Sequence, residues 1–426
     1  MQNCIKDLVQ NSSVQKLFIS LYGNNADTAV QRYSDLAEAF FAHFGKTEKQ
    51  IRFFSSPGRS EIGGNHTDHN LGKVLAASIN LDCIGAVCAN GTNRVRIADI
   101  SYNEKFEVAV DQTEIIPSEK GSIALVRGIL QAFKHAGYSI GGFDACFSTT
   151  VIAAAGVSSS ASFEMILCQI LNSLFNNNSI SVENRAIAGQ FAENKYWNKA
   201  SGLLDQMACA AGGLVSIDFI HPEKPLLKKI PFDFSSHKHR LLIVNTGKGH
   251  ADLSQEYSSI PGEMKEIARF FGKSTLRDLT RDDVIQNLKA IRKSCTDRAV
   301  MRAMHYFDEN DRVDAEVKAL ENNDFDAFLD LVRSSGNSSW KYLQNVYVPS
   351  HPEEQSISIA LALTENFISN HKKGSCRIHG GGFAGVILAF LPEDLCPSYT
   401  KMMEDALEEG CVYDMAIRPY GSIEIC

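Results

Sequence analysis

Several features that define specialised protein classes are missing from this sequence. Its 11 cysteines form no C-x-x-C pair, and their odd number does not fit a framework of paired disulfides. The longest apolar run, residues 383–391, is about half of the roughly 20 residues that a membrane helix needs. The N-terminal residues lack the apolar core of a secretory signal. These absences exclude a zinc ribbon and a secreted disulfide scaffold, and we expect a cytoplasmic protein with no membrane partner.

An excess of positive charge is missing too. Lys and Arg number 42 against 50 Asp and Glu, which gives a formal net charge of −8. That balance offers no overall electrostatic footprint for nucleic acid, so we expect no nucleic-acid partner. Hydrophobic residues make up 44% of the 426 residues, the usual share in globular proteins of two or three domains. A phosphorylated small molecule can still bind, because local amides, a metal ion and a few cations hold phosphate groups.

The order of predicted helices and strands indicates an α+β or α/β protein with two lobes. Helical periodicity in the first 50 residues is interrupted at residues 55–58 and followed by β-branched runs within residues 73–100. Residues 221–225 are polar, contain proline and have the composition of a linker. We therefore expect two units, residues 1–225 and residues 226–426. No internal repeat or low-complexity segment is present in the sequence.

A first polar segment, residues 57–70, combines glycines with Arg59, His66, Asp68 and His69. Side chains that both donate and accept hydrogen bonds suit a polar ligand such as a sugar. A surface loop rich in Gly, Asn and Asp is the structural alternative. The two histidines lack a clear third ligand for a metal ion.

A second segment, residues 152–161, consists of small residues between a predicted strand and an apolar helix. Its backbone can approach a ligand closely, and the amides at a helix N-terminus form an anion site. The hydroxyl of Ser160 can also ligate Mg²⁺. A serine N-cap after a tight turn is the structural alternative. The segment is neither a Walker loop nor a nucleophile elbow, because no Gly-Lys-Ser/Thr follows and Ser160 replaces the elbow's second glycine.

A third segment places Gly380, Gly381 and Gly382 before an apolar strand, which indicates either a close backbone approach to a ligand or a structural turn. Between the second and third segments, Asp205 follows a glycine-containing loop and is either a helix N-cap or a base. Glu193 lies on the preceding predicted helix, where a solvated position is the ordinary expectation.

Taken in order, these segments read Pro-Gly-Arg…His-Thr-Asp, Gly-x-Ser-Ser-Ser-Ala, Gly-x-x-Asp-Gln and Gly-Gly-Gly-Phe-x-Gly. The set resembles galactokinases over nearly the whole chain. The first segment is specific to that family, whereas the second and third mark its superfamily with homoserine, mevalonate and phosphomevalonate kinases. The resemblance implies the α+β, two-lobed fold of these GHMP kinases. It implies a left-handed βαβ unit in the N-terminal domain, an exception to the usual handedness, a ferredoxin-like C-terminal domain, and an active site between the two.

The resemblance also implies an ATP-dependent kinase that phosphorylates the anomeric hydroxyl of galactose. Arg59 and Asp205 would flank the reacting hydroxyl, with Asp205 accepting or orienting its proton and Arg59 stabilising charge. The implied sugar contacts are Asn65, His66, Asp68, Gly202 and Tyr257. The implied ATP contacts are Gly156, Ser158, Ser159, Ser160, Gly381 and Gly382, and the implied ligands of the Mg²⁺ cofactor are Ser160 and Glu193. We expect a monomer or weak homodimer.

Two positions depart from the family pattern. Most galactokinases carry Glu where this chain has Asn65, a position that reaches the C6 hydroxyl of the sugar. The phosphate loop has alanines at residues 153–155 in place of Pro-x-Gly-x-Gly. Because a missing carboxylate at Asn65 removes the repulsion against a uronic acid, galacturonate or another hexose or uronate is the alternative substrate. A non-catalytic sugar sensor is a further alternative, although such sensors typically lack the Ser160–Ala161 pair that is present here. Another metabolite kinase of the superfamily would not explain the His-Thr-Asp segment.

Overall fold

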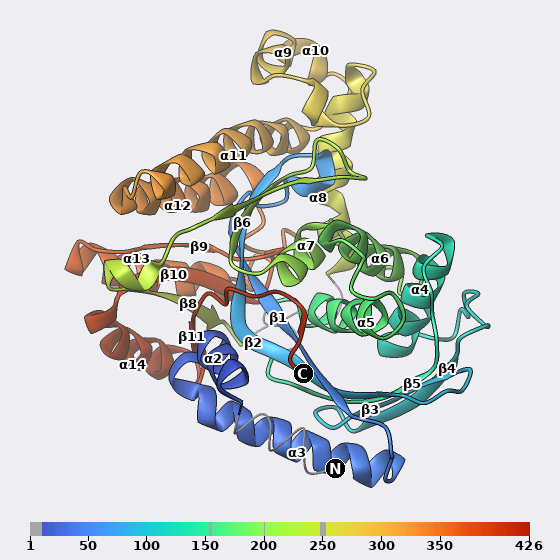
Figure 1. Cartoon of the computed structure of the whole chain (residues 1–426). Coiled ribbons are helices and arrows are strands. Elements are labelled where there is room, and N and C mark those ends of the chain that lie inside the picture. Colours follow the sequence, from blue (N-terminus) through green and yellow to red (C-terminus); the bar gives the residue numbers. More distant parts are fainter. Residues whose placement is uncertain (1–10, 153–155, 200, 248–252) are drawn as a thin grey trace.

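The computed structural model describes residues 11–152, 156–199, 201–247 and 253–426. Its strands form two sheets with helices packed on their faces (Figure 1). This arrangement confirms the predicted α+β class. No helix within these described ranges is both long and apolar enough to cross a membrane.

The first sheet contains, among the described residues, eight strands in the order β12-β1-β2-β5-β3-β4, with β6 beside β2 and β7 beside β6. The strands are β1 (Arg52–Gly63), β2 (Lys73–Ala89), β3 (Arg94–Asp99), β4 (Glu104–Ala109), β5 (Phe143–Thr149), β6 (Leu214–Asp218), β7 (Leu226–Ile230) and β12 (Ile423–Glu424). Strands β3 and β5 pair in parallel, and the chain between them forms β4 and a helix. The left-handed sense of this crossover stays a prediction.

Strand β2 is covered on both faces, which explains its almost continuous apolar run. Cys83 and Val87 belong to one buried cluster, and Ile84, Ala86 and Cys88 belong to another. Successive side chains of a strand point to opposite faces, so the two clusters lie on the two sides of the sheet. The first face is covered by α4 (Ser122–His135), α5 (Ser159–Phe175), α6 (Val182–Lys195) and α7 (Leu204–Ala211), and the second by α2 (Ser12–Tyr22) and α3 (Ala26–Phe44) (Figure 1).

The second sheet has the strand order β11-β8-β10-β9. Its strands are β8 (His239–Asn245), β9 (Ser375–Ile378), β10 (Val386–Pro392) and β11 (Val412–Met415). One face packs on α13 (Ser356–His371) and α14 (Cys396–Ala406), and the other on α11 (Asp297–Glu321) and α12 (Phe325–Ser338). The cluster on the α11–α12 side also contains Ile62 and Leu75 of the first sheet, so one apolar core joins the two sheets.

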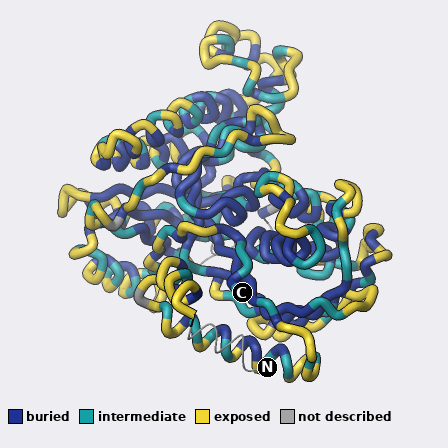
Figure 2. Tube along the Cα trace, viewed as in Figure 1, coloured by how far each residue is buried: buried dark blue, intermediate teal, exposed yellow. Residues whose placement is uncertain are grey.

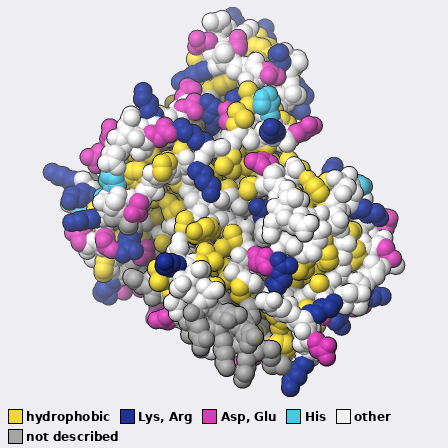
Figure 3. All heavy atoms as spheres, viewed as in Figure 1, with side chains coloured by type: hydrophobic (Ala, Val, Ile, Leu, Met, Phe, Trp, Pro, Cys, Tyr) yellow, Lys and Arg dark blue, Asp and Glu magenta, His cyan; other side chains and the backbone are white. Residues whose placement is uncertain are grey.

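The remaining helices, α8 (Ser254–Phe270), α9 (Arg281–Gln286) and α10 (Leu288–Ile291), form a smaller cluster with the start of α11. In Figure 1, α9 and α10 project beyond the rest of the molecule, and Figure 2 shows the outer surface of this projection to be exposed. Most buried residues lie in the sheets and in the helices beside them (Figure 2). On the face seen in Figure 3, side chains of both charge signs are interspersed.

The break in regular structure that the sequence predicts at residues 55–58 does not form. These residues lie inside β1, and every residue of that strand after Arg52 is buried. The pairing of β1 with β2 shifts register between Pro57 and Arg59, which marks a bulge. Because a bulge accommodates proline and glycine within a ladder, the expected break is an irregular strand.

Candidate active site

Strand β1 passes directly beside the segment predicted to bind phosphate. A β-carbon on Gly58 would lie 2.7 Å from the carbonyl oxygen of Val157. The backbone N–H of Arg59 donates to the same oxygen at 3.1 Å. Glycine at position 58 therefore permits the close approach of two backbones, and this contact places Arg59 beside the residues that precede α5.

Arg59 and Asp205 form an ion pair. Arg59 Nε donates to Asp205 Oδ1 at 2.7 Å, and Nη2 lies 2.7 Å from the same oxygen. Burial alone would lower the pKa of Arg59, but the charges of Asp205 and Glu61 hold it above its ordinary value. Burial alone would raise the pKa of Asp205, but Arg59 and the Ser158 hydroxyl bring it below its ordinary value. Asp205 is therefore an ionised carboxylate, and it keeps 25% of its side chain exposed.

Ser158 connects this carboxylate to the start of α5. Its Oγ donates to Asp205 Oδ2, and its backbone is left-handed, with a φ of 61°. Gly156 also has a positive φ, 65°, and its carbonyl accepts a hydrogen bond from Arg59 Nη1. The first amides of α5 have no intrahelical acceptors, so they form an anion site at this end of the helix. Residues 153–155 of the predicted loop lie outside the described residues.

Glu193 is buried against Ser160, the residue with which it is predicted to bind a metal ion. Ser160 Oγ donates to Glu193 Oε1 at 2.8 Å, and Glu193 is 1% exposed. Ser201 Oγ and Gln206 Nε2 donate to Glu193 Oε2 at 2.6 and 3.0 Å. Lys199 Nζ contacts Glu193 Oε1 and lies 3.2 Å from Ser160 Oγ. Glu193 therefore belongs to a buried network and not to a solvated helix face.

The oxygens of Ser160 and Glu193 fit a hard divalent cation. Mg²⁺ is usually held by one or two protein side chains together with phosphate oxygens and water. In the part of the chain that the structure describes, no group of three or more His, Cys, Asp or Glu side chains could hold a metal ion alone. Lys199 shows that positive charge is favourable here. Burial alone would lower the pKa of Lys199, but the charge and hydrogen bond of Glu193, together with the charges of Asp205 and Glu164, raise it. The pair can thus supply part of a metal site beside the anion site.

Asp68 lies against the loop that leads into α7, the helix that carries Asp205. Asp68 Oδ1 accepts from the backbone N–H of His69 at 2.9 Å, and Oδ2 accepts from that of Leu204 at 3.5 Å. A β-carbon on Gly202 would lie 1.7 Å from Asp68 Oδ2. Only glycine fits at position 202 in this arrangement. The structure thus places Gly202 directly beside Asp68, and both are predicted to contact the sugar.

His66 and Tyr257 both contact the glycine turn. His66 Nε2 donates to the carbonyl of Gly381 at 2.9 Å, and the Tyr257 hydroxyl donates to that of Gly382 at 3.3 Å. A β-carbon would lie 2.4 Å from Tyr257 Cε1 at Gly381, and 2.3 Å from the carbonyl oxygen of Asn345 at Gly382. Burial lowers the pKa of His66 to about 3, so its imidazole is neutral. Glycine therefore allows the turn to pack closely against Tyr257 at position 381 and against Asn345 at position 382.

Asn65 is fully buried, and its side-chain amide is bonded entirely within the protein. Nδ2 donates to Glu61 Oε1 and to the carbonyl of Gly380, both at 2.8 Å. Oδ1 accepts from Asn345 Nδ2 at 3.0 Å and from Ser339 Oγ at 3.3 Å. These four bonds use the whole capacity of the amide. The contact with a C6 hydroxyl stays a prediction, and it requires this network to open.

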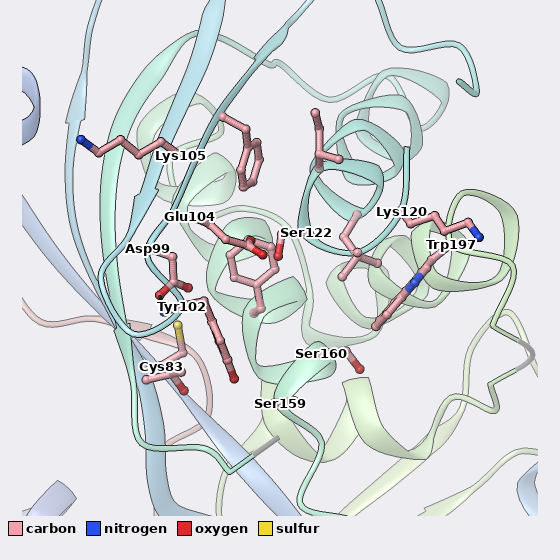
Figure 4. Close-up of a pocket in the computed structure, with 16 residues that line it drawn as sticks. Cys83, Asp99, Tyr102, Glu104, Lys105, Lys120, Ser122, Ser159, Ser160 and Trp197 are labelled. Atoms are coloured by element: carbon pink, nitrogen blue, oxygen red, sulfur yellow. Dashed lines mark hydrogen bonds between the residues drawn. The ribbon is translucent and has the colours of Figure 1, made fainter. Parts of the chain in front are cut away.

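A cavity of about 600 Å³ opens at the start of α5. Figure 4 shows Asp99, Tyr102 and Glu104 on one wall, Lys120 and Trp197 on the opposite wall, and Ser159 and Ser160 at one end. Apolar side chains complete the walls: Phe106, Ile123, Leu125 and Phe163. This cavity could not be predicted from the sequence, because its walls come from separate elements and carry no shared motif.

The structure brings most of the predicted residues together. Arg59, Asp205 and Ser158 form one connected set. Ser160 lies two residues after Ser158, in the first turn of α5, and it bonds to Glu193 on α6. Two residues that bond to Glu193, Lys199 and Ser201, were not predicted. Their sequence signal is weak, since both stand in the short loop between α6 and α7.

The chain and its fold are similar to those of a known protein family. Residues 38–89 match the family model described as "Galactokinase galactose-binding signature", and residues 124–213 match "GHMP kinases N terminal domain". A galactokinase of Haemophilus influenzae is 30% identical over 386 residues, which cover 88% of this chain and 93% of the relative.

Two solved structures give the same result for the fold. A Lactococcus lactis galactokinase complexed with galactose has a TM-score of 0.79 and 25% identity, and the match covers 92% of this chain and 99% of that one. A Methanococcus jannaschii mevalonate kinase has a TM-score of 0.61 at 14% identity, with 87% of this chain and 99% of that chain covered. The second likeness concerns the fold alone.

Proposed function

Because this chain belongs to the galactokinase family, we propose that it transfers the γ-phosphoryl group of ATP to the anomeric hydroxyl of galactose. The relatives named galactokinase match over most of their own length, and the Lactococcus lactis relative was crystallised with galactose. These comparisons do not favour a uronic acid. The observation that carries the proposal is the Arg59–Asp205 pair, 2.7 Å apart and bonded through Ser158 to the anion site at α5.

Asp205 would orient the anomeric hydroxyl and accept its proton. Its carboxylate is ionised and retains exposed surface, and Arg59 neutralises part of the charge around it. Phosphoryl transfer depends mainly on positioning and on charge stabilisation, which these two side chains supply. Ser158 binds the second carboxylate oxygen, so the hydroxyl-activating group and the phosphate loop are held in one frame.

ATP would bind with its phosphates at Gly156, Ser158, Ser159 and Ser160, and with its nucleoside in the cavity of about 600 Å³ beside them. The cavity combines apolar walls with a few polar side chains, as small-molecule sites usually do. Gly381 and Gly382 would close over the phosphates from the second sheet. Figure 4 supports this assignment, since Ser159 and Ser160 stand at the end of the cavity.

Mg²⁺ would be held by Ser160 and Glu193. A bound Mg²⁺ supplies positive charge that neutralises phosphate oxygens. Ser201 and Gln206 fix one oxygen of Glu193, which leaves Oε1 directed at Ser160 and Lys199. Lys199 would exchange its contact with Glu193 for a contact with a phosphate oxygen when the nucleotide binds.

The sugar would lie among His66, Asp68, Gly202 and Tyr257, with Asn65 behind them at C6. Asp68 and the neutral His66 provide acceptors and donors for hydroxyl groups. We further propose that the chain divides into residues 1–225 and residues 226–426. Strands β7 and β12 of the second part pair with strands of the first sheet. We propose a cytoplasmic monomer or weak homodimer whose partners are a sugar and ATP.

A coupled assay of ADP formation tests this function. The purified chain would be given MgATP and, separately, galactose, glucose, galacturonate and no sugar. Galactose should give the largest kcat/KM, and ³¹P NMR should identify the product as a 1-phosphate. Faster turnover of galacturonate than of galactose would contradict the proposed substrate, and no turnover with any sugar would contradict the proposed activity.

A further inference from the structure

His379 stands at the end of β9, directly before the glycine turn, and it is 1% exposed. Its Nε2 accepts a hydrogen bond from the backbone N–H of Glu61 at 3.1 Å, and Ser60 Oγ lies 3.0 Å from the same atom. A backbone N–H can only donate, so Nε2 carries no proton in this arrangement. The neutral imidazole therefore carries its proton on Nδ1.

The surroundings of the ring favour its neutral form. Burial, together with the positive charges of Arg59 and Arg377, lowers the pKa of His379 well below its ordinary value. Protonation would place a further charge beside two guanidinium groups in a dry interior, which is unfavourable. Nδ1–H is consequently an uncharged donor.

Among the residues that the structure describes, this donor has no partner. Nδ1 is buried, and it makes no hydrogen bond there. Buried donors are nearly always bonded, because an unpaired one loses its hydrogen bonds to water without replacement. The two nitrogens of one ring thus differ sharply, since Nε2 is fully used and Nδ1 is unused.

The unused nitrogen faces the phosphate-loop residue Gly156. A β-carbon on Gly156 would lie 3.3 Å from His379 Nδ1. One on Gly380 would lie 3.7 Å from the Gly156 carbonyl oxygen, the atom to which Arg59 Nη1 donates. Nδ1–H therefore points to the place where the loop, the glycine turn and Arg59 meet. Arg59 Nη1 is itself a donor there, and the Gly156 carbonyl already accepts from it, so the described groups leave Nδ1–H without an acceptor.

We propose that His379 Nδ1–H donates a hydrogen bond to a phosphoryl oxygen of the nucleotide bound at Gly156–Ser160. The proposal rests on the proposed function, and it adds a substrate-contacting residue that no motif assigned. An uncharged donor complements Arg59, because it directs a phosphoryl oxygen without adding charge that would hold the product. The close fit of the ring against Gly156 gives this contact a fixed direction.

Two substitutions separate the two nitrogens. The amide of Asn reaches the position of Nδ1, and that of Gln reaches the position of Nε2. His379→Gln keeps an acceptor for the Glu61 N–H and removes the donor beside Gly156, whereas His379→Asn does the reverse. Dissociation constants for MgATP and for ADP would be measured by calorimetry without sugar, and melting temperatures would be measured for both variants.

We expect His379→Gln to bind MgATP roughly tenfold or more weakly at a nearly unchanged melting temperature, since a hydrogen bond to a charged phosphoryl oxygen is lost. His379→Asn should bind within about threefold of wild type and melt at a lower temperature. In the wild type, the low-field proton signal of the ring N–H should shift when MgATP is added and stay in place with galactose alone.

Wild-type binding by His379→Gln, or a ring N–H signal that MgATP leaves unmoved, would overturn the proposal. Equal losses in both variants would also overturn it, because they would indicate a structural role only. If wild type binds neither MgATP nor ADP, the proposed function fails and this contact fails with it. The NMR measurement needs no variant, so a variant that does not fold leaves a decisive result.

Discussion

Gly202 and Asp68 lie so close together that a β-carbon on Gly202 would be 1.7 Å from Asp68 Oδ2. The Asp68 carboxylate packs directly against the backbone of Gly202. Because the same loop leads into α7, a side chain at position 202 must move either Asp68 or the helix that carries Asp205.

Gly202→Ala is expected to raise the KM for galactose roughly tenfold to a hundredfold, since a misplaced carboxylate loses charge-assisted hydrogen bonds to sugar hydroxyls. The KM for ATP should change little. Steady-state kinetics with each substrate varied would show this split. Gly262→Ala is the matched control, because nothing lies within 4 Å of a β-carbon there and Ala suits a helix interior. An unchanged galactose KM in Gly202→Ala would remove Asp68 from the sugar site.

Asp205→Asn is expected to lower kcat by roughly 10²-fold or more while binding of sugar and ATP stays within several-fold of wild type. The amide keeps the shape of the carboxylate but cannot take a proton, and Arg59 loses its counter-charge. Rapid-quench measurement of a single turnover would separate the chemical step from product release. More than about a tenth of the wild-type kcat would take Asp205 out of the mechanism.

Activity should be lost on the acid side only at a pH below the usual pKa range of an aspartic acid. The folded-state pKa of Asp205 is lowered, so its carboxylate is charged above that value and activity falls only as pH drops through it. The same shift stabilises the folded protein above the unfolded-state pKa, and that contribution is lost as pH falls. Ser158→Ala removes one hydrogen bond, worth about 1 kcal/mol, and should move this loss of activity upward by about 0.5–1 pH unit. If wild type and Ser158→Ala lose activity at the same acidic pH, the group that titrates there is not Asp205.

Glu193→Gln is expected to raise the Mg²⁺ concentration for half-maximal activity by roughly tenfold without unfolding the protein, because a neutral amide oxygen is a weaker ligand for a hard cation. Glu183→Gln, on the same helix α6, is the control for loss of a carboxylate. Paramagnetic broadening by Mn²⁺ in the presence of ADP would report metal binding independently of turnover. Identical titration curves for the two variants would place the metal elsewhere.

Asn65→Glu is expected to destabilise the protein by about 3–5 kcal/mol. The new carboxylate would face Glu61 Oε1 and the Gly380 carbonyl, which now accept hydrogen bonds from Asn65 Nδ2. This repulsion would raise the pKa of the new side chain, so the destabilisation should be smallest at low pH and grow as pH rises. Denaturant melts at several pH values would test this expectation, with Asn65→Gln as the neutral control. Full stability of Asn65→Glu at neutral pH would show that the side chain of residue 65 does not depend on this buried network.

Elements whose signal is local could be predicted from the sequence. The residues of α6 and β5 show helical and apolar patterns over their own length, and both elements form as expected. The strand β1 could not be predicted in the same way, because residues 55–58 have the propensities of a turn. Pairing with β2 on one side and close approach of the Val157 backbone on the other outweigh those propensities.

The pairing of Arg59 with Asp205 could be inferred only through family resemblance, since the two residues are 146 positions apart in sequence. The burial of Asn65 could not be inferred at all. Its partners include Asn345, 280 positions away, and Gly380, 315 positions away, and neither carries a local signal of the contact. Lys199 was missed for the same reason, because a lysine in a short polar loop is ordinary until Glu193 is found beside it.

Strand β1 pairs at its outer edge with β12, near the C-terminal end of the chain, so this edge can be covered only late in biosynthesis. Phe54 and Ser55 pair with Glu424 and Ile423, and Arg52 forms an ion pair with Glu424. A ribosome makes β1 early, yet the strand that covers its edge emerges only after the whole second sheet. Until then the nascent polypeptide presents an uncovered edge five residues before Arg59, of the kind that pairs with other chains. Chaperones that shield extended segments during translation should therefore matter for yield, and premature stop codons near position 420 should produce insoluble product.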